Sequence, residues 1–137
     1  MASLTAGVPR SLLLVRTGAT GVISMAICQA GLAAGTFFGG VDLLAYHRLF
    51  GYVTLAVSVL AAILAGLYMR DGGPLWVLAF SVVVAVWAAV QVTLGELGVA
   101  SLHAFSGVLF AMAATALTSW VFRHEHVPRA SGASAPA

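Results

Sequence analysis

The sequence contains no lysine and few charged residues of any kind: six arginines and four acidic side chains, 7% of its 137 residues. An ordinary soluble domain carries roughly 25% charged residues. Hydrophobic residues make up 61% of the chain, so a water-soluble fold of this size could not cover its surface with polar groups. The composition also excludes a disordered chain, because such chains combine low hydrophobicity with high net charge.

Cysteine is nearly absent as well. The one thiol, Cys28, excludes an internal disulfide, and its place in an apolar run predicts a buried structural role. The arginines are scattered rather than clustered, which argues against nucleic-acid binding. No glycine-rich phosphate loop, paired carboxylates or Ser-His-Asp set is recognisable, so a hydrolase or a nucleotide-using enzyme is disfavoured. Arginine without lysine, beside abundant alanine, valine and glycine, is typical of a GC-rich bacterial genome.

Four apolar runs are long enough to cross a bilayer, which takes about 20 helical residues. They occupy residues 17–39, 45–69, 74–97 and 102–122. The first run is too long for the apolar core of a signal peptide, so we interpret it as a helix. Because the connections are short, consecutive helices must run antiparallel as neighbours. The sequence therefore predicts an all-α fold, a four-transmembrane-helix up-down bundle spanning residues 17–122.

The segments outside this bundle predict its orientation. Residues 1–16 form a short N-terminal segment, and residues 123–137 form a tail that is rich in Ala, Ser, Gly and Pro and predicted to be disordered. Five arginines fall at the two termini and the middle connection: Arg10, Arg16, Arg70, Arg123 and Arg129. Arg48 stands alone on the other side. The positive-inside rule then predicts a multi-pass protein of the bacterial inner membrane with both termini cytoplasmic.

The two halves of the chain share a pattern, Q-x-x-L followed by H-x-x-x-G. It comprises Gln29, His47 and Gly51 in the first half, and Gln91, His103 and Gly107 in the second. In both halves the glutamine lies on the first helix of a hairpin and the histidine begins the next helix. This pattern is consistent with a tandem repeat of two helix hairpins. The match is short, so duplication and chance similarity remain alternatives.

The two histidines suggest a cofactor site. His47 and His103 begin the second and fourth helices, which lie diagonally across an up-down bundle and leave room for a flat macrocycle. A glycine four residues after each histidine shares its helical face and removes side-chain bulk below the imidazole. This arrangement predicts bis-histidine ligation of a haem b iron. Arg48 is placed to pair with a haem propionate, while Gln29 and Gln91 lie deeper, where an amide needs a partner.

Simpler interpretations of these residues remain open. An interfacial histidine can hydrogen-bond a loop carbonyl or a lipid headgroup, and glycines in membrane helices usually mark close packing. His124 and His126 flank Glu125 beyond the last helix, and we interpret them as a solvated cap rather than a metal site.

The first helix carries two overlapping G-x-x-x-G steps, formed by Gly31, Gly35 and Gly39. Such steps let another helix approach closely. The partner helix belongs either to the same bundle or to another chain. If it belongs to another chain, these steps predict a homo- or hetero-oligomer.

Two motifs resemble heme A synthase. The segment Ala45-Tyr-His-Arg48 is similar to that family's histidine–arginine motif, and Gln91-Val-Thr-Leu-Gly95 followed by His103 is similar to its Q-x-x-L-G…H pattern. The family consists of two four-helix halves, and residues 17–122 resemble one of them. The resemblance implies haem ligation by His47 and His103.

The chain departs from that family at its catalytic motif. The family has a glutamate three residues before the helix-two histidine, where this chain has Leu44. The resemblance therefore implies haem holding without oxidation of a haem methyl group. The chain also resembles uncharacterised small four-helix bacterial membrane proteins.

Three classes of function follow. The leading hypothesis is a b-type cytochrome-like membrane protein that transfers electrons with quinone or another membrane redox partner, or holds or senses haem. The alternative is a non-catalytic scaffold or accessory subunit of a larger membrane complex. A multidrug-type transporter needs an ionisable group deep in the membrane, and Glu96 lies at the outer end of the third helix, which disfavours that class.

Overall fold

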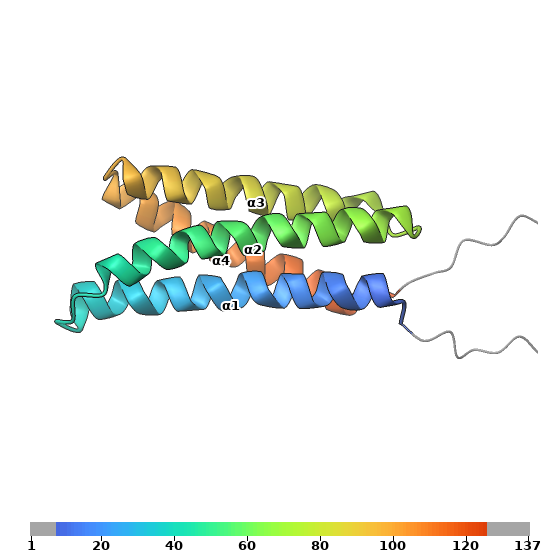
Figure 1. Ribbon diagram of the computed structural model, residues 1–137, viewed down its shortest axis with the longest axis horizontal. Helices are drawn as coiled ribbons and strands as arrows, with labels where there is room; N and C mark the ends of the chain where they lie inside the picture. The colour runs from blue at the N-terminus through green and yellow to red at the C-terminus, as the bar shows by residue number, and fades with distance from the viewer. Residues whose placement is uncertain (1–7, 126–137) are drawn as a thin grey trace, which may run out of the picture.

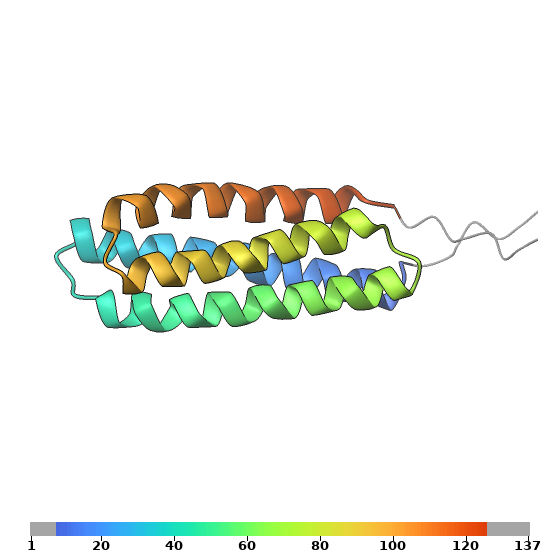
Figure 2. The same cartoon turned by 90° about the horizontal axis from the view of Figure 1, so that it is seen from above.

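The computed structural model describes residues 8–125, and all of their regular structure is helical. The four helices are α1 (Arg10–Phe38), α2 (Leu44–Arg70), α3 (Leu75–Glu96) and α4 (Ala100–Arg123). They run alternately up and down, so that α1 begins and α4 ends at the same end of the bundle (Figures 1 and 2). The predicted all-α four-helix bundle is confirmed.

The helix bounds differ from the predicted ones mainly at the start of the chain. Residues 1–16 were predicted to lie outside the bundle, but α1 begins at Arg10, directly after Pro9. The additional turns are helical because Leu12 and Val15 are buried in the core. The other bounds lie within two residues of prediction. His126, Arg129 and the predicted disordered tail lie outside the described residues.

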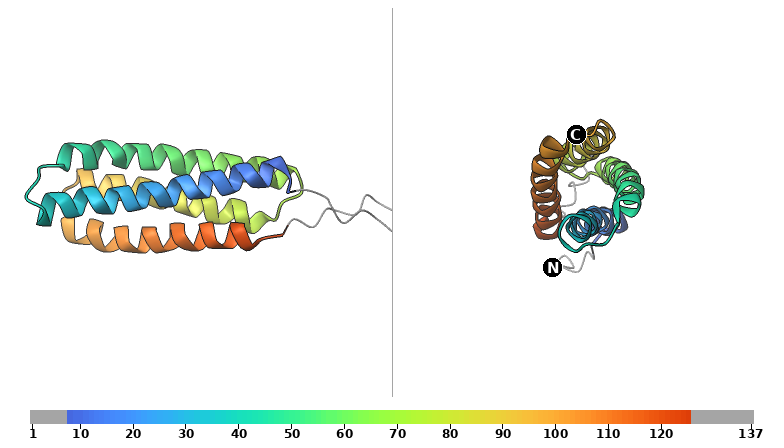
Figure 3. Two further views of the ribbon diagram at one scale, coloured as in Figure 1. Left: turned by 90° about the horizontal axis from the view of Figure 1, so that it is seen from below. Right: turned by 90° about the vertical axis from the view of Figure 1, so that its left-hand side faces the viewer.

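Each helix packs against two neighbours. α1 and α3 both contact α2 and α4, whereas the diagonal pairs α1–α3 and α2–α4 make no close backbone contact within the described residues. The view along the bundle shows the four helices arranged around a central axis (Figure 3, right). This confirms that the helices carrying His47 and His103 are diagonal.

The core is built from small side chains. Its buried members include Ala19, Ala61, Ala65, Ala88 and Ala114. At Gly18 an added Cβ would lie 3.2 Å from the Cα of Ala61, so this glycine allows the backbones of α1 and α2 to approach closely. Packing through small residues is characteristic of helices in membranes, where no hydrophobic effect drives helices together.

The outer surface of the bundle is apolar, and each helix is long and apolar enough to cross a bilayer. The shortest, α3, has 22 residues, or about 33 Å at 1.5 Å per residue, which matches a hydrocarbon core of about 30 Å. Large exposed side chains such as Leu60, Ile63 and Val86 face outward. The chain is therefore an integral, multi-pass membrane protein in contact with the lipid bilayer.

The two ends of the bundle differ in charge. Arg10, Arg16, Arg70 and Arg123 lie at the end where α1 begins and α4 ends, which we call the arginine-rich end. There Arg16 donates hydrogen bonds to the main-chain carbonyls of Val121, Phe122 and His124, at 3.1–3.2 Å. These bonds satisfy carbonyls at the end of α4 and attach it to α1. The assignment of this end to the cytoplasm remains a prediction.

Candidate functional site

The candidate site is a pair of histidines at the opposite end, which we call the histidine end. His47 lies in the first turn of α2 and His103 in the first turn of α4, and both are half-buried. Their ring centroids are 5.9 Å apart and their planes cross at 82°. The structure thus brings together, across the bundle diagonal, the two histidines that the sequence singled out.

Each imidazole is oriented by a main-chain carbonyl of the preceding helix. Nδ1 of His47 lies 3.2 Å from the carbonyl oxygen of Gln29, and Nδ1 of His103 lies 3.0 Å from that of Gln91. A carbonyl oxygen only accepts hydrogen bonds, so Nδ1 carries the proton in both rings. In the neutral imidazole Nε2 then keeps its lone pair, which is the arrangement typical of a metal-ligating histidine.

The glycines below the histidines make room for glutamine side chains. A Cβ added to Gly51 would lie 3.2 Å from Nε2 of Gln29, and one added to Gly107 would lie 3.5 Å from Oε1 of Gln91. Removal of bulk on this face was predicted from the sequence. The structure shows that the amides occupy the freed space, one helical turn below each imidazole.

These amides carry unsatisfied polar atoms. Within the described residues, Oε1 of Gln29 and Nε2 of Gln91 are buried without a hydrogen-bond partner. A buried polar atom without a partner costs about 1–3 kcal/mol. The unsatisfied atom is an acceptor oxygen in Gln29 and a donor nitrogen in Gln91. The site therefore offers two hydrogen-bonding positions that the protein itself does not fill.

The two hairpins build this site in the same way. In each, the glutamine carbonyl accepts a hydrogen bond from the histidine, and a Cβ added to the glycine one turn later would meet the glutamine amide. The shared sequence pattern thus corresponds to a shared three-dimensional arrangement. This agreement supports the interpretation of the chain as a tandem repeat of two hairpins.

Arg48 has a different partner from the predicted one. Its guanidinium forms a bidentate ion pair with Glu96 of α3, with Nε 2.8 Å from Oε1 and Nη2 bound to Oε2. The hydroxyl of Tyr52 donates to the same carboxylate at 3.0 Å. Sequence analysis missed this cluster, although Arg48 and Glu96 are opposite charges predicted at the same end. The pairing connects α2 to α3 and occupies the group that was expected to bind a propionate.

The histidine pair offers two nitrogen donors, fewer than a bare metal ion usually takes from a protein. No group of three or more His, Cys, Asp or Glu side chains in residues 8–125 could hold a metal ion. Haem needs only axial ligands from the protein, because the porphyrin supplies the other four. Imidazole nitrogens bind metals at about 2 Å, so two histidine rings that share one metal ion have centroids about 6 Å apart. The observed 5.9 Å allows such sharing, and it is equally the spacing of an ordinary edge-to-face ring pair.

The other predicted positions lie elsewhere. His124 was expected to be a solvated cap, but it is half-buried, with Nε2 3.2 Å from the hydroxyl of Tyr68 and its ring centroid 5.7 Å from that of Trp76. His124 directly follows α4, and its ring lies against Tyr68 of α2 and Trp76 of α3. His126, its predicted companion, lies outside the described residues.

The glycines of α1 do not form one open face. No atom lies within 4 Å of a Cβ added to Gly31, but at Gly35 that Cβ would lie 2.7 Å from the side chain of Leu43. Gly39 follows the end of α1, where its N–H bonds back to Gly35. A side chain of the same chain therefore covers the middle of the predicted stripe.

No protein-family model, curated protein or solved structure matches this chain. The resemblance to heme A synthase therefore stays an expectation from short motifs, and the argument for function depends on the site itself.

Proposed function

We propose that this membrane protein binds one haem b between His47 and His103 and acts as a small cytochrome-like protein. The observation that supports the proposal most strongly is the matched pair of imidazoles. They come from diagonal helices, each donates its Nδ1–H to a main-chain carbonyl, and their ring centroids lie 5.9 Å apart.

The protein's own residues would hold the haem and control its surroundings. His47 and His103 would supply the nitrogens that bind the iron, and the carbonyls of Gln29 and Gln91 would fix the two ring orientations. The unsatisfied amide atoms would provide polar contacts one turn below. Haem supplies one-electron chemistry when bound. The partner in electron transfer would be a quinone or another redox protein of the bacterial inner membrane, unless the protein only holds or senses haem.

This proposal does not include haem A synthesis. Leu44 stands where that family has its catalytic glutamate, and its side chain is 56% exposed on the outside of α2. Arg48, next to the proposed ligand, is paired with Glu96. An electron-transfer protein is therefore better supported than an enzyme that oxidises a haem methyl group.

Reconstitution with haem tests the proposal. Haem added to purified apoprotein in detergent should bind one per chain and give a low-spin absorption spectrum. His47→Ala and His103→Ala should lose this spectrum to the same extent, because the two halves of the site are equivalent. His124→Ala, at the arginine-rich end, is the matched control and should bind haem normally. Binding retained by a His47→Ala/His103→Ala double variant would refute the proposal.

The position of the glutamine amides beside Gly51 and Gly107 favours a second candidate function. Because the glutamine amides already occupy the space below the histidines, the bundle is closed without a cofactor, as a scaffold or accessory subunit would be. Gly31, open on the surface of α1, is then the expected contact with a partner chain. Gly31→Leu should reduce complex size on a native gel, and an unchanged size would count against this candidate.

A further inference from the structure

The arginine-rich end holds a second hollow that the proposed haem site does not use. It has a volume of about 320 Å³ and is lined by Trp76, Trp120, Arg123 and His124. The two tryptophans come from opposite sides of the α3–α4 seam, and their ring centroids are 6.1 Å apart. Phe80 extends this group, with its ring centroid 5.4 Å from that of Trp120. The lining is mainly aromatic and contains one guanidinium group.

Arg123 is held at the edge of this hollow with its charge uncompensated. Nε donates to the carbonyl oxygen of Ser119 at 3.2 Å, and Nη2 donates to the hydroxyl of Ser119 at 2.7 Å. Both acceptors are neutral and lie on the same helix. The one ion pair within residues 8–125 is between Arg48 and Glu96 at the other end. The guanidinium is therefore positioned, exposed and available to an anion.

The charge around the hollow also favours an anion. The arginine-rich end has four arginines against two acidic residues, Asp71 and Glu125. The histidine end has Arg48 against Asp42 and Glu96. Tryptophans with arginines at one end of a membrane bundle are typical of the level at which phospholipid headgroups lie. An anion bound here would lie at that level.

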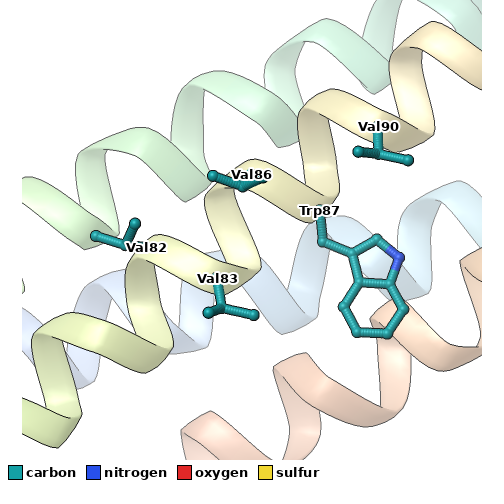
Figure 4. A pocket seen from close by; sticks show the side chains of 5 residues that line it. All are labelled: Val82, Val83, Val86, Trp87 and Val90. Carbon is teal, nitrogen blue, oxygen red and sulfur yellow. The ribbon is translucent and has the colours of Figure 1, made fainter.

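An apolar row continues from the hollow along α3. Trp76, Phe80, Val83, Trp87 and Val90 are spaced four, three, four and three residues apart, so they share one face of the helix. A second, shallow hollow of about 420 Å³ lies along this stretch, lined by Val82, Val83, Val86, Trp87 and Val90 (Figure 4). From Trp76 to Val90 the helix rises about 21 Å, comparable to an extended acyl chain.

We propose that an anionic phospholipid binds at this place, with its phosphate at Arg123, its glycerol region against Trp76 and Trp120, and an acyl chain along the apolar row of α3. A lining that is mostly apolar around one cation suits an amphiphile better than a soluble anion, which would lose hydration without gaining enough polar contacts. The proposal depends on membrane insertion and is independent of haem binding.

Tryptophan quenching tests the site. The three tryptophans all lie in the hollow or in the row along α3, so the fluorescence of the unchanged chain reports on this place. Nanodiscs of phosphatidylcholine would contain a minor fraction of brominated phosphatidylglycerol or, in parallel, brominated phosphatidylcholine. We expect the anionic lipid to reach half-quenching at about tenfold lower content, because a direct hydrogen bond from a guanidinium to a charged phosphate is worth about that factor.

Arg123→Gln should remove this preference. Arg70→Gln is the matched control, because it deletes the same charge at the same end outside the hollow, and it should keep the preference. Equal quenching by the two brominated lipids would overturn the proposal. An equal loss in Arg70→Gln and Arg123→Gln would also overturn it, because it would indicate general charge attraction instead of a site.

Discussion

Replacing the half-buried Gln29 and Gln91 by leucine should stabilise the protein when no haem is bound. Gln29 and Gln91 each bury one amide atom without a hydrogen-bond partner. The histidines bind the main-chain carbonyls of these residues, and any residue at positions 29 and 91 keeps that acceptor. Leucine has nearly the same helix propensity as glutamine. Gln29→Leu and Gln91→Leu therefore remove an unsatisfied polar group while leaving the histidine hydrogen bonds in place.

The expected gain in stability follows from the free-energy cost of burying an amide atom that has no hydrogen-bond partner. That cost is about 1–3 kcal/mol in proteins generally. In a membrane the unfolded helices also find polar partners, which reduces such differences. We therefore expect a gain of about 1 kcal/mol in the free energy of unfolding for each variant, measured by SDS-induced unfolding of the apoprotein in mixed micelles.

A third variant serves as the control. The hydroxyl of Thr118 shares its one hydrogen between the carbonyl oxygen of Ala114 in its own helix, at 2.8 Å, and that of Ala19 across the α1–α4 interface, at 3.1 Å. Thr118→Val removes a satisfied polar group and should lower stability by about 0.6 kcal/mol, the average for such bonds in a membrane protein. If Gln29→Leu and Gln91→Leu also lost stability, the amides would have structural partners, and our reasoning about the unfilled positions would be wrong.

Three further predictions concern the histidine end and the connections. The crossed planes of His47 and His103, at 82°, predict one strongly anisotropic low-field line in the electron paramagnetic resonance spectrum of the oxidised haem protein, and a three-line rhombic spectrum would contradict this. Arg48→Gln should keep its haem content by pyridine haemochrome assay, because the guanidinium binds Glu96, whereas a loss as large as in His47→Ala would show that Arg48 also holds the cofactor. Gly98→Ala should cost about 1–2 kcal/mol in SDS unfolding, since its φ is +68° with open space around it, and an unchanged stability would contradict the assigned turn.

The fold could be predicted from the sequence because lipid permits few solutions. Four apolar runs with short connections leave an antiparallel bundle as the simplest arrangement. The early start of α1 was missed since Arg10 and Arg16 suggested a polar flank. In the structure, Arg16 lies against the end of α4 and binds its carbonyls. A side chain that caps a distant helix leaves no local pattern in the sequence.

The sequence predicted which residues form the candidate site, but it did not predict all of the contacts among them. The shared Gln, His and Gly pattern identified residues that the structure brings together in two equivalent sets. Which atoms meet was not predictable from spacing. The amides of Gln29 and Gln91 lie beside Gly51 and Gly107, and Arg48 pairs with Glu96. Spacing along the chain does not predict these contacts, because they depend on how α1 and α3 pack beside α2 and α4.

The most direct test of haem binding is a reduced-minus-oxidised visible spectrum of the protein purified in detergent from haem-supplemented cells. Ligation by His47 and His103 predicts a narrow low-spin α band in the wild-type protein and none in the His47→Ala/His103→Ala variant. A flat spectrum from well-folded wild-type protein, or the same band in the double variant, would contradict the proposed function.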